Sequence, residues 1–360
     1  MSRMESWPEP IIRVQELSES GIKEIPEHFV KLPADRPCFI ETTSHVDNIP
    51  LIDLENLKSF DESIRVETME LISKACREWG FFQVVNHGVS HELVAYVRGV
   101  WREFFHLPLE EKQKLANSPV TYEGYGSRLG VVEGAKLDWC DYFFLHYLPQ
   151  LLKDENKWPS LPISCRQITA EYGQQLVNLC ERLTKILSIN LGLNEDYLHK
   201  KFGGDNERGA CLRVNFYPKC PQPDLTLGLS PHSDPGGLTL VLPDTDVTGL
   251  QVRRGDDWMT VKPAPNAFIV NIGDQIQVNI ANAIYKSVEH RVIVNSAKER
   301  ISLAFFYNPG GNILIKPADE LVTEDQPALY SPMTFNEYRA FIRTKGPCGK
   351  SLVESLKSPR

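Results

Sequence analysis

The residues whose types and spacing could do chemistry lie in the C-terminal half of the chain, around His232 and Asp234. One residue separates them, so on an extended segment both side chains point to the same side and can reach one metal ion. A chain with 9 histidines and many aspartates contains about one such pair by chance, and a surface turn is the alternative interpretation. The pair therefore indicates a metal site only together with a further ligand.

His290 is the candidate third ligand, in the stretch 286–292 (KSVEHRV). A β-barrel would bring this expected strand back beside residue 232. Two histidines and one carboxylate with open coordination positions form the facial triad suited to non-haem Fe(II) and O2 chemistry. An ion pair between His290 and a neighbouring carboxylate is the alternative.

Two further pairs indicate a site for a dicarboxylate. Arg300 and Ser302 share one face of an expected strand and offer a guanidinium and a hydroxyl to one carboxylate. Asn215 and Tyr217 share a face in the same way, and the phenol of Tyr217 can donate a further hydrogen bond. A dicarboxylate that binds iron at one end and Arg300 at the other fits this pattern.

The elements that must position these residues show two different periodicities. From residue 212 onward the apolar pattern has a period of two, with short strands separated by turns, which is typical of a sandwich or jelly roll. We expect strands at 238–242, 249–252, 258–261, 267–272, 287–294 and 301–306, with a hairpin turn at 254–257.

The N-terminal half is richer in helical spacing. Strands at 49–54 and 81–86 flank a helix whose apolar stripe runs from Ile64 to Trp79, and the longest helix is expected at 168–193. His87 follows the second strand and is either a metal ligand or, as we favour, a turn histidine. The aromatic residues between 118 and 149 form either a core hairpin or the wall of an apolar pocket.

Composition excludes several classes of protein. With 360 residues and 42% hydrophobic content the chain can bury a large core, and a net charge of −8 argues against a nucleic-acid-binding surface. No apolar run is long enough to span a membrane, and the first residues do not resemble a secretion signal. The 8 scattered cysteines are typical of reduced thiols, so we expect a cytoplasmic protein, with the nucleus as a second compartment. We also expect a monomer.

The combined motifs resemble those of the plant Fe(II)- and 2-oxoglutarate-dependent dioxygenases. The resemblance covers nearly the whole chain, and one departure is 281–283 (ANA), where the family often has Ser-Asn-Gly. The matching stretches are 79–88 (WGFFQVVNHG), 215–221 (NFYPKCP), 232–234 (HSD), 290–292 (HRV) and 300–306 (RISLAFF).

The resemblance implies a mainly β core, a double-stranded β-helix or jelly roll, with a helix-rich N-terminal domain and a C-terminal helix. We place the N-terminal arm at 1–45, the helix-rich domain at 46–205, the jelly roll at 206–315 and a helical lid and tail at 316–360. The resemblance also implies that His232, Asp234 and His290 bind iron. It implies that Arg300, Ser302, Tyr217 and Asn215 hold 2-oxoglutarate. The implied reaction decarboxylates 2-oxoglutarate to succinate and CO2 while O2 hydroxylates a C–H bond, with ascorbate as the reductant.

Within that family the chain looks most similar to the jasmonate-induced oxygenases, which inactivate the hormone jasmonic acid by hydroxylation. Flavonoid oxygenases of the anthocyanidin synthase or flavonol synthase type share parts of the pattern and are the alternative. A binding protein on the same scaffold is a non-enzymatic alternative, against which the complete ligand set argues. The stretches that carry the similarity are 7–11 (WPEPI), 122–130 (YEGYGSRLG), 138–144 (DWCDYFF) and 334–339 (TFNEYR).

Spacing also indicates an acidic, apolar substrate. Arg213 shares a strand face with Asn215 and Tyr217, so it would meet a second carboxylate, unless it pairs with a structural Asp or Glu. Phe335 and Arg339 share one face of an expected C-terminal helix that either covers the pocket or only packs on the barrel. The expected substrate-binding residues are Arg213, Arg339, Phe335, Phe144 and Phe306.

Overall fold

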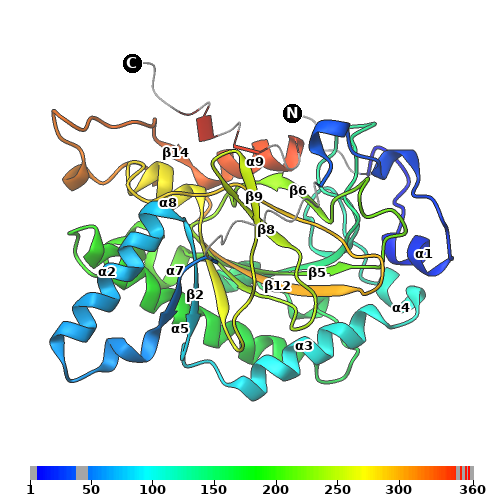
Figure 1. The fold of residues 1–360 in the computed structure, drawn as a ribbon, viewed down its shortest axis with the longest axis horizontal. Coiled ribbons are helices and arrows are strands. Elements are labelled where there is room, and N and C mark those ends of the chain that lie inside the picture. The colour runs from blue at the N-terminus through cyan, green and yellow to red at the C-terminus, as the bar shows by residue number, and fades with distance from the viewer. Residues whose placement is uncertain (1–5, 38–47, 346–348, 351–352, 355, 357–360) are drawn as a thin grey trace.

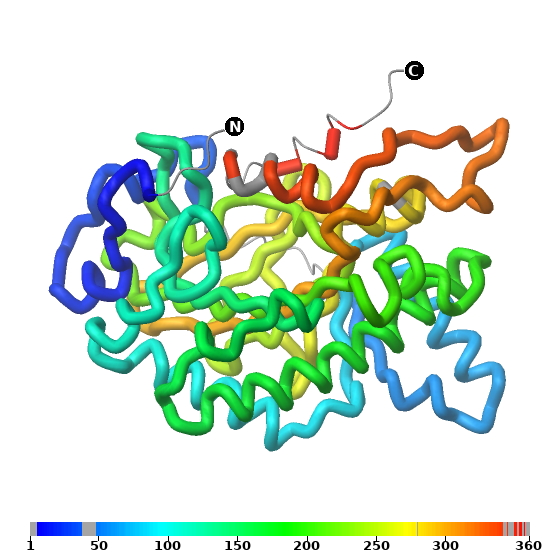
Figure 2. The backbone as a smooth tube through the Cα atoms, turned by 180° about the vertical axis from the view of Figure 1, so that it is seen from behind, coloured from blue at the N-terminus to red at the C-terminus, as the bar shows by residue number. Residues whose placement is uncertain are grey.

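The computed structural model describes residues 6–37, 48–345, 349–350, 353–354 and 356, without the side chains of residues 279, 341–343 and 345. Its core is a pair of β-sheets, with the long helices along one side and the C-terminal helix along the other (Figure 1). The same arrangement is seen from behind in Figure 2.

The larger sheet contains strands from both halves of the chain. β1 runs parallel to its neighbour β2, and all the other neighbouring strands of this sheet are antiparallel to each other. In spatial order the strands are β1 (Leu51–Asp53), β2 (Phe81–Val85), β10 (Phe268–Ile272), β7 (Leu238–Leu242), β12 (Arg300–Asn308), β5 (Gly209–Tyr217), β4 (Asp141–Leu148) and β3 (Gly124–Gly126).

The smaller sheet faces the larger one and completes the jelly roll, so the predicted fold class is confirmed. Its strands are short, with three to five residues each. In spatial order they are β6 (Leu229–His232), β11 (His290–Val292), β8 (Leu250–Arg254) and β9 (Asp257–Thr260). A separate pair consists of β13 (Leu314–Ile315) and β14 (Met333–Thr334).

The α-helices lie mostly outside the barrel. Asp61 and Ser90 cap α2 and α3, because each side chain accepts a hydrogen bond from a backbone N–H of the first turn. The helices are α1 (Val14–Glu19), α2 (Glu62–Glu78), α3 (His91–Phe105), α4 (Leu109–Gln113), α5 (Cys165–Asn190), α6 (Tyr197–Lys201), α7 (Gly204–Glu207), α8 (Asp274–Asn279) and α9 (Phe335–Lys345).

Short 3-10 helices occur in the connections. They are η1 (Glu27–Phe29), η2 (Pro33–Asp35), η3 (Leu54–Lys58), η4 (Gln150–Leu152), η5 (Glu155–Lys157) and η6 (Asp319–Leu321).

Periodicity located the long elements within a few residues and erred at their ends. The stripe predicted for α2 is wrong at Ile64, which is exposed, while Ile72, Ala75 and Cys76 are buried. Ile64 lies in the first turn of α2 and stays 37% exposed. The hairpin turn at 254–257 is confirmed by the pairing of Arg254 with Asp257 and by Gly255 at φ +61°.

Two alternatives left open by the sequence are resolved. The aromatic segment 118–149 is both a hairpin and part of a pocket wall. β3 and β4 form the hairpin, and Phe144 on β4 also lines a cavity. His87 is a turn histidine: its Nε2 lies 3.0 Å from the Asn266 carbonyl oxygen and its Nδ1 accepts from the Val89 N–H. The division of the chain into four parts stays a prediction, and the boundary at residue 45 lies outside the described residues.

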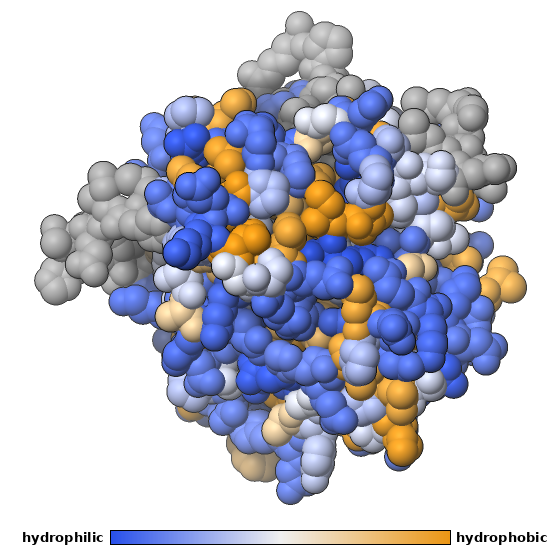
Figure 3. Space-filling view, turned by 90° about the vertical axis from the view of Figure 1, so that its right-hand side faces the viewer, coloured by the Kyte–Doolittle hydropathy of each residue, from blue (hydrophilic) through white to orange (hydrophobic). Residues whose placement is uncertain are grey.

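Much of the surface is hydrophilic (Figure 3), and the described cysteines are free thiols. Hydrophilic side chains cover most of the face in Figure 3, and hydrophobic ones gather in its upper half. Within the described ranges no helix combines the length and apolarity needed to cross a membrane. Six cysteines are free thiols, while Cys38 and Cys348 lie outside those ranges.

The segment 281–283, which departs from the family pattern, forms hydrogen bonds with residues 327–329. Asn282 Nδ2 donates to the Pro327 carbonyl oxygen, and its Oδ1 accepts from the Leu329 N–H. Both Asn282 and Ala283 have left-handed backbones, with φ +45° and +66°. The main structural effect of this departure is therefore backbone strain at Ala283, a position where the family often has glycine.

Replacing Ala283 by glycine is expected to stabilise the protein. A left-handed backbone costs a residue with a Cβ about 1–2 kcal/mol, and glycine loses about 0.5–1 kcal/mol more on folding, so the net gain is about 0.5–1 kcal/mol. Urea unfolding measures it, with Ala170→Gly inside α5 as the matched control that destabilises by about 1 kcal/mol. Equal destabilisation by both variants would show that Ala283 is unstrained.

Candidate active site

The three predicted metal ligands come together at one end of the smaller sheet. His232 at the end of β6 is the direct antiparallel partner of His290 at the start of β11, and their ring centres are 4.2 Å apart. Asp234 Oδ1 lies 3.7 Å from His232 Nε2 and 3.6 Å from His290 Nε2. Three potential ligand atoms therefore surround one point.

Backbone carbonyls orient the two rings. His232 Nδ1 lies 2.8 Å from the Ser230 carbonyl oxygen, and His290 Nδ1 lies 3.2 Å from that of Val288. With Nδ1 protonated and donating, each Nε2 keeps its lone pair for a metal. Burial, together with the neighbouring His290, lowers the pKa of His232 to about 4, so its ring is neutral at pH 7, as a ligand must be.

Asp234 is fixed by two residues that the sequence did not reveal. Its Oδ2 accepts from Thr239 Oγ1 at 2.6 Å and from Asn271 Nδ2 at 2.5 Å, which leaves Oδ1 turned toward the histidines. Thr239 and Asn271 are paired residues on the neighbouring strands β7 and β10. Only the sheet register places them there, so no local motif could have identified them.

The donor set fits a divalent iron ion. Two neutral imidazoles and one carboxylate on one side of a point leave the opposite side free for other ligands. A second His/Asp/Glu group within the described residues, Glu181, His199 and Asp205, differs in that Arg208 pairs with both of its carboxylates. Both carboxylates of this group are therefore already held in ion pairs with an arginine.

The four residues predicted to hold a dicarboxylate form two cross-strand pairs. Arg300 faces Tyr217 and Ser302 faces Asn215 in the register of β12 and β5. All four are buried, and Arg300 Nη1 lies 3.3 Å from Ser302 Oγ. A buried guanidinium requires an anion, and these neighbours add hydroxyl and amide donors around it.

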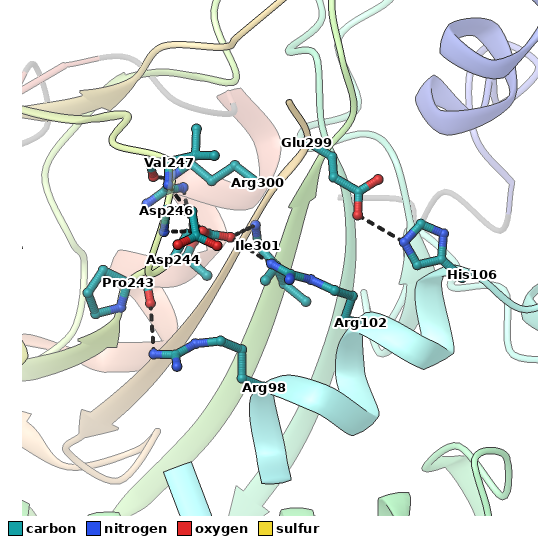
Figure 4. A network of polar contacts seen from close by, with 11 residues as sticks. Arg98, Arg102, His106, Pro243, Asp244, Asp246, Val247, Glu299, Arg300 and Ile301 are labelled. Carbon is teal, nitrogen blue, oxygen red and sulfur yellow. Dashed lines mark hydrogen bonds and ion pairs between the residues drawn. The ribbon is translucent and has the colours of Figure 1, made fainter. Parts of the chain in front are cut away.

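A hydrogen-bond network around Asp244 positions Arg300 through the loop that contains Val247 (Figure 4). Asp244 Oδ1 accepts from the Asp246 and Val247 N–H groups, and its Oδ2 accepts from Arg102 on α3 and from the Ile301 N–H. The loop that Asp244 folds in this way presents the Val247 carbonyl, which accepts from Arg300 Nε at 3.2 Å. Arg300 is thus held through its Nε, and its Nη1 lies beside Ser302 Oγ, where both groups can bind one ligand.

A cavity of about 200 Å³ opens beside the His232–Asp234 pair. It is mostly apolar, as a site for a small apolar ligand should be. All five predicted substrate-binding residues line it: Arg213, Arg339, Phe335, Phe144 and Phe306. The sequence analysis did not single out Leu129, Cys211 and Asn308 as residues of the cavity wall, because they are neither aromatic nor charged.

The two cavity arginines contact aromatic rings and an amide. Arg213 Nε donates to Asn215 Oδ1 at 2.6 Å, and its Cζ lies 4.1 Å from the centre of the Tyr142 ring. Arg339 Cζ lies 5.3 Å from the centre of the Phe335 ring, as their helical spacing predicts, and burial lowers its pKa. Among the residues that the structure describes, no carboxylate pairs with either arginine, so the structural ion pair considered for Arg213 is not formed there.

Comparison with known proteins identifies the class first. Residues 208–309 match the model of the 2OG-Fe(II) oxygenase superfamily, and residues 49–161 match the model named non-haem dioxygenase in morphine synthesis N-terminal. The chain belongs to the 2OG-Fe(II) oxygenase superfamily, and it is a dioxygenase that depends on Fe(II) and 2-oxoglutarate.

Individual relatives narrow this class. The chain is 60% identical to jasmonate-induced oxygenase 3 of Arabidopsis thaliana, with 100% of each protein covered. It superposes with a TM-score of 0.92 on the crystal structure of JOX2 in complex with 2OG, Fe and JA, at 60% identity over 98% of this chain and 100% of that one. Leucoanthocyanidin dioxygenase of Malus domestica is more distant, at 40% identity over 91% of this chain and 93% of its own.

Proposed function

We propose that this enzyme hydroxylates jasmonic acid at a C–H bond and so inactivates the hormone. The observation that carries the proposal is the cavity beside the metal site, where two arginines that pair with no described carboxylate meet three phenylalanines. Jasmonic acid is a small cycloalkanone with one carboxylate, and this lining matches both parts of it. The identity to the jasmonate-induced oxygenases supports the same substrate.

His232, Asp234 and His290 would hold the iron. The carbonyls of Ser230 and Val288 fix the imidazole orientation, and Thr239 and Asn271 fix the carboxylate. Bound Fe(II) supplies O2 activation and C–H oxidation, chemistry that no side chain can supply. The protein provides three ligands on one side and leaves the rest of the coordination sphere to 2-oxoglutarate and O2.

Arg300, Ser302, Tyr217 and Asn215 would hold 2-oxoglutarate. The guanidinium and the Ser302 hydroxyl would bind the carboxylate far from the metal, while Tyr217 and Asn215 donate to the same molecule. Arg300 is already oriented by the Val247 carbonyl, so little side-chain freedom is lost on binding. The reaction converts the substrate, 2-oxoglutarate and O2 to hydroxylated product, succinate and CO2, with one oxygen atom of O2 in each organic product.

Arg213 and Arg339 would bind the jasmonate carboxylate from β5 and α9, and Phe335, Phe144 and Phe306 would pack on its apolar body. This fixes which C–H bond lies nearest the metal and keeps bulk water out. We further propose that the enzyme works as a monomer in the cytoplasm with ascorbate as the reductant.

The methyl ester of jasmonic acid tests carboxylate recognition, because it removes the charge and keeps the shape. Wild-type protein is expected to bind the acid at least about tenfold more tightly than the ester, since a charge-assisted bond is worth about 1.5–3 kcal/mol. The Arg213→Ala, Arg339→Ala double variant should lose most of this preference. Isothermal titration of acid and ester against both proteins measures it.

Arg254→Ala is the matched control, because Arg254 is exposed and stacks on Trp79 outside the cavity. It should keep the wild-type preference for the acid. Equal binding of acid and ester by the wild type would refute carboxylate recognition and favour a neutral flavonoid substrate.

A further inference from the structure

The short helix α8 holds the loop that carries Asp234. The N–H groups of Gly273, Asp274 and Gln275 donate to the carbonyl oxygens of Gly237, Asp234 and Gly236 at 2.8, 2.8 and 2.9 Å. The Gln275 side chain donates to the remaining carbonyl of this loop, that of Pro235, at 3.1 Å. The start of α8 therefore determines the path of residues 234–237.

The Asp274 carboxylate joins this loop to α9. Its Oδ2 accepts from Ser233 Oγ at 3.1 Å and from Tyr338 Oη at 2.7 Å. Ser233 stands between two proposed iron ligands, and Tyr338 stands between Phe335 and Arg339 on the helix that covers the substrate cavity. All three bonded residues are buried, with exposed fractions of 4% or less.

Apolar packing also joins α8 and α9. Tyr338 packs with Val278, Tyr330, Phe335 and Val353 in a small cluster separate from the main core. Figure 1 shows α8 and α9 together at the upper side of the molecule. Replacing Tyr338 by phenylalanine keeps the aromatic ring in this cluster and removes the hydroxyl that donates to Asp274.

We propose that Asp274 is a positioning residue that ties α9, over the substrate cavity, to the loop that carries the iron ligands. If α9 moves outward, Tyr338 leaves Asp274, and a buried carboxylate loses one of its donors. Ser233 still donates to the same oxygen, so a shift of the Asp274 carboxyl group is passed to the metal-binding loop. If the loop becomes disordered, Asp274 is no longer held by Ser233, and the bond from Tyr338 to Asp274 is weakened.

The coupling gives α9 and the loop a reciprocal effect on each other. A substrate carboxylate that binds Arg339 and draws α9 inward would order residues 233–237, and an ordered loop would favour the closed helix. The identity of that carboxylate rests on the proposed function, whereas the coupling between the two segments does not.

Hydrogen exchange in the full-length, metal-free protein tests the coupling without turnover. In Tyr338→Phe we expect exchange about tenfold faster both in α9 and in the peptides containing residues 233–237 and 273–275, because a buried carboxyl group loses one of its hydrogen-bond partners. In Ser233→Ala, whose change is remote from α9, the amides of α9 should also exchange faster. Tyr330→Phe is the matched control: its hydroxyl lies 3.3 Å from Gln277 Nε2 on the same helix α8 but does not reach the loop.

Wild-type rates in residues 233–237 of Tyr338→Phe, or wild-type rates in α9 of Ser233→Ala, would overturn the proposal. Equal effects of Tyr330→Phe and Tyr338→Phe on the loop would do the same, since they would indicate general loosening of the apolar cluster. Turnover adds a second readout, because Tyr338→Phe should release more succinate per molecule of hydroxylated product than Tyr330→Phe. Failure of jasmonic acid to protect α9 in the wild type would count against the substrate and leave the ligand-free comparison valid.

Discussion

Replacing His232 or Asp234 by alanine is expected to abolish turnover while the protein stays folded. Each variant removes one of three ligand atoms that surround a single point. Loss of a residue that only supports a metal ligand costs about 10- to 100-fold in affinity or activity, and loss of the ligand itself should cost more. Asp234→Ala should also retain iron less well, because it removes the one negative charge of the triad.

The support residues provide a graded series for this prediction. Thr239→Val and Asn271→Ala each remove one bond to Asp234 Oδ2 and should reduce iron affinity by about 10- to 100-fold. His91→Ala and Asp256→Ala change exposed residues of the same types as the ligands and should have no effect. Iron content and succinate formation at saturating Fe(II) are measured, and substantial activity in folded His232→Ala or Asp234→Ala would refute the triad.

Arg300→Ala is expected to raise the KM for 2-oxoglutarate far more than the KM for the organic substrate. Truncating one partner of a buried charge pair costs about 2–5 kcal/mol, which corresponds to about 30-fold to several thousand-fold. Arg300→Lys should recover only part of the loss, because an ammonium group keeps the charge but not the two-pronged geometry. Ser302→Ala should cost roughly tenfold, as expected for one hydrogen bond to a charged group.

Arg213→Ala is the reciprocal control for Arg300→Ala, since both remove a partly or fully buried arginine near the site. It should raise the KM for the organic substrate and change that for 2-oxoglutarate little. The reverse pattern would mean that the two carboxylate sites are exchanged. Steady-state kinetics with each substrate varied in turn distinguishes these outcomes, and circular dichroism confirms the fold of both variants.

The sequence predicted best what depends on alternation along a strand. The i, i+2 rule placed His232 with Asp234, Arg300 with Ser302, and Arg213 with Asn215, and the structure brings each pair onto a common side. Helical spacing placed Phe335 beside Arg339 for the same reason. These relations are local, so no knowledge of the tertiary structure was needed.

The relations that the sequence could not supply depend on the register of distant strands. Thr239 and Asn271 reach Asp234 because β7 and β10 pair in one particular register. The position of His290 beside His232 was an inference from a barrel, and no residue near His290 specifies its partner strand. α8 was missed because six residues are too few to show a helical period.

The sequence also could not predict side-chain contacts between separate helices, strands and loops. Asp274 is one of many aspartates in the sequence, and only the folded chain brings it to both Ser233 and Tyr338. Ile64 shows the opposite error, because an apolar residue in the expected phase is left 37% exposed. In both cases the packing partner decides the outcome, and a single sequence does not contain that information explicitly.

The most direct test of the proposed function is a mass-spectrometric assay of the purified enzyme with Fe(II), 2-oxoglutarate, ascorbate and O2. Jasmonic acid and a panel of flavonoid substrates are supplied in separate reactions, and succinate is measured beside each product. We expect a product of jasmonic acid with one additional oxygen atom, formed in a one-to-one ratio with succinate. Oxidation of a flavonoid with no oxidation of jasmonic acid, or succinate formation that no added substrate stimulates, would contradict the proposed function.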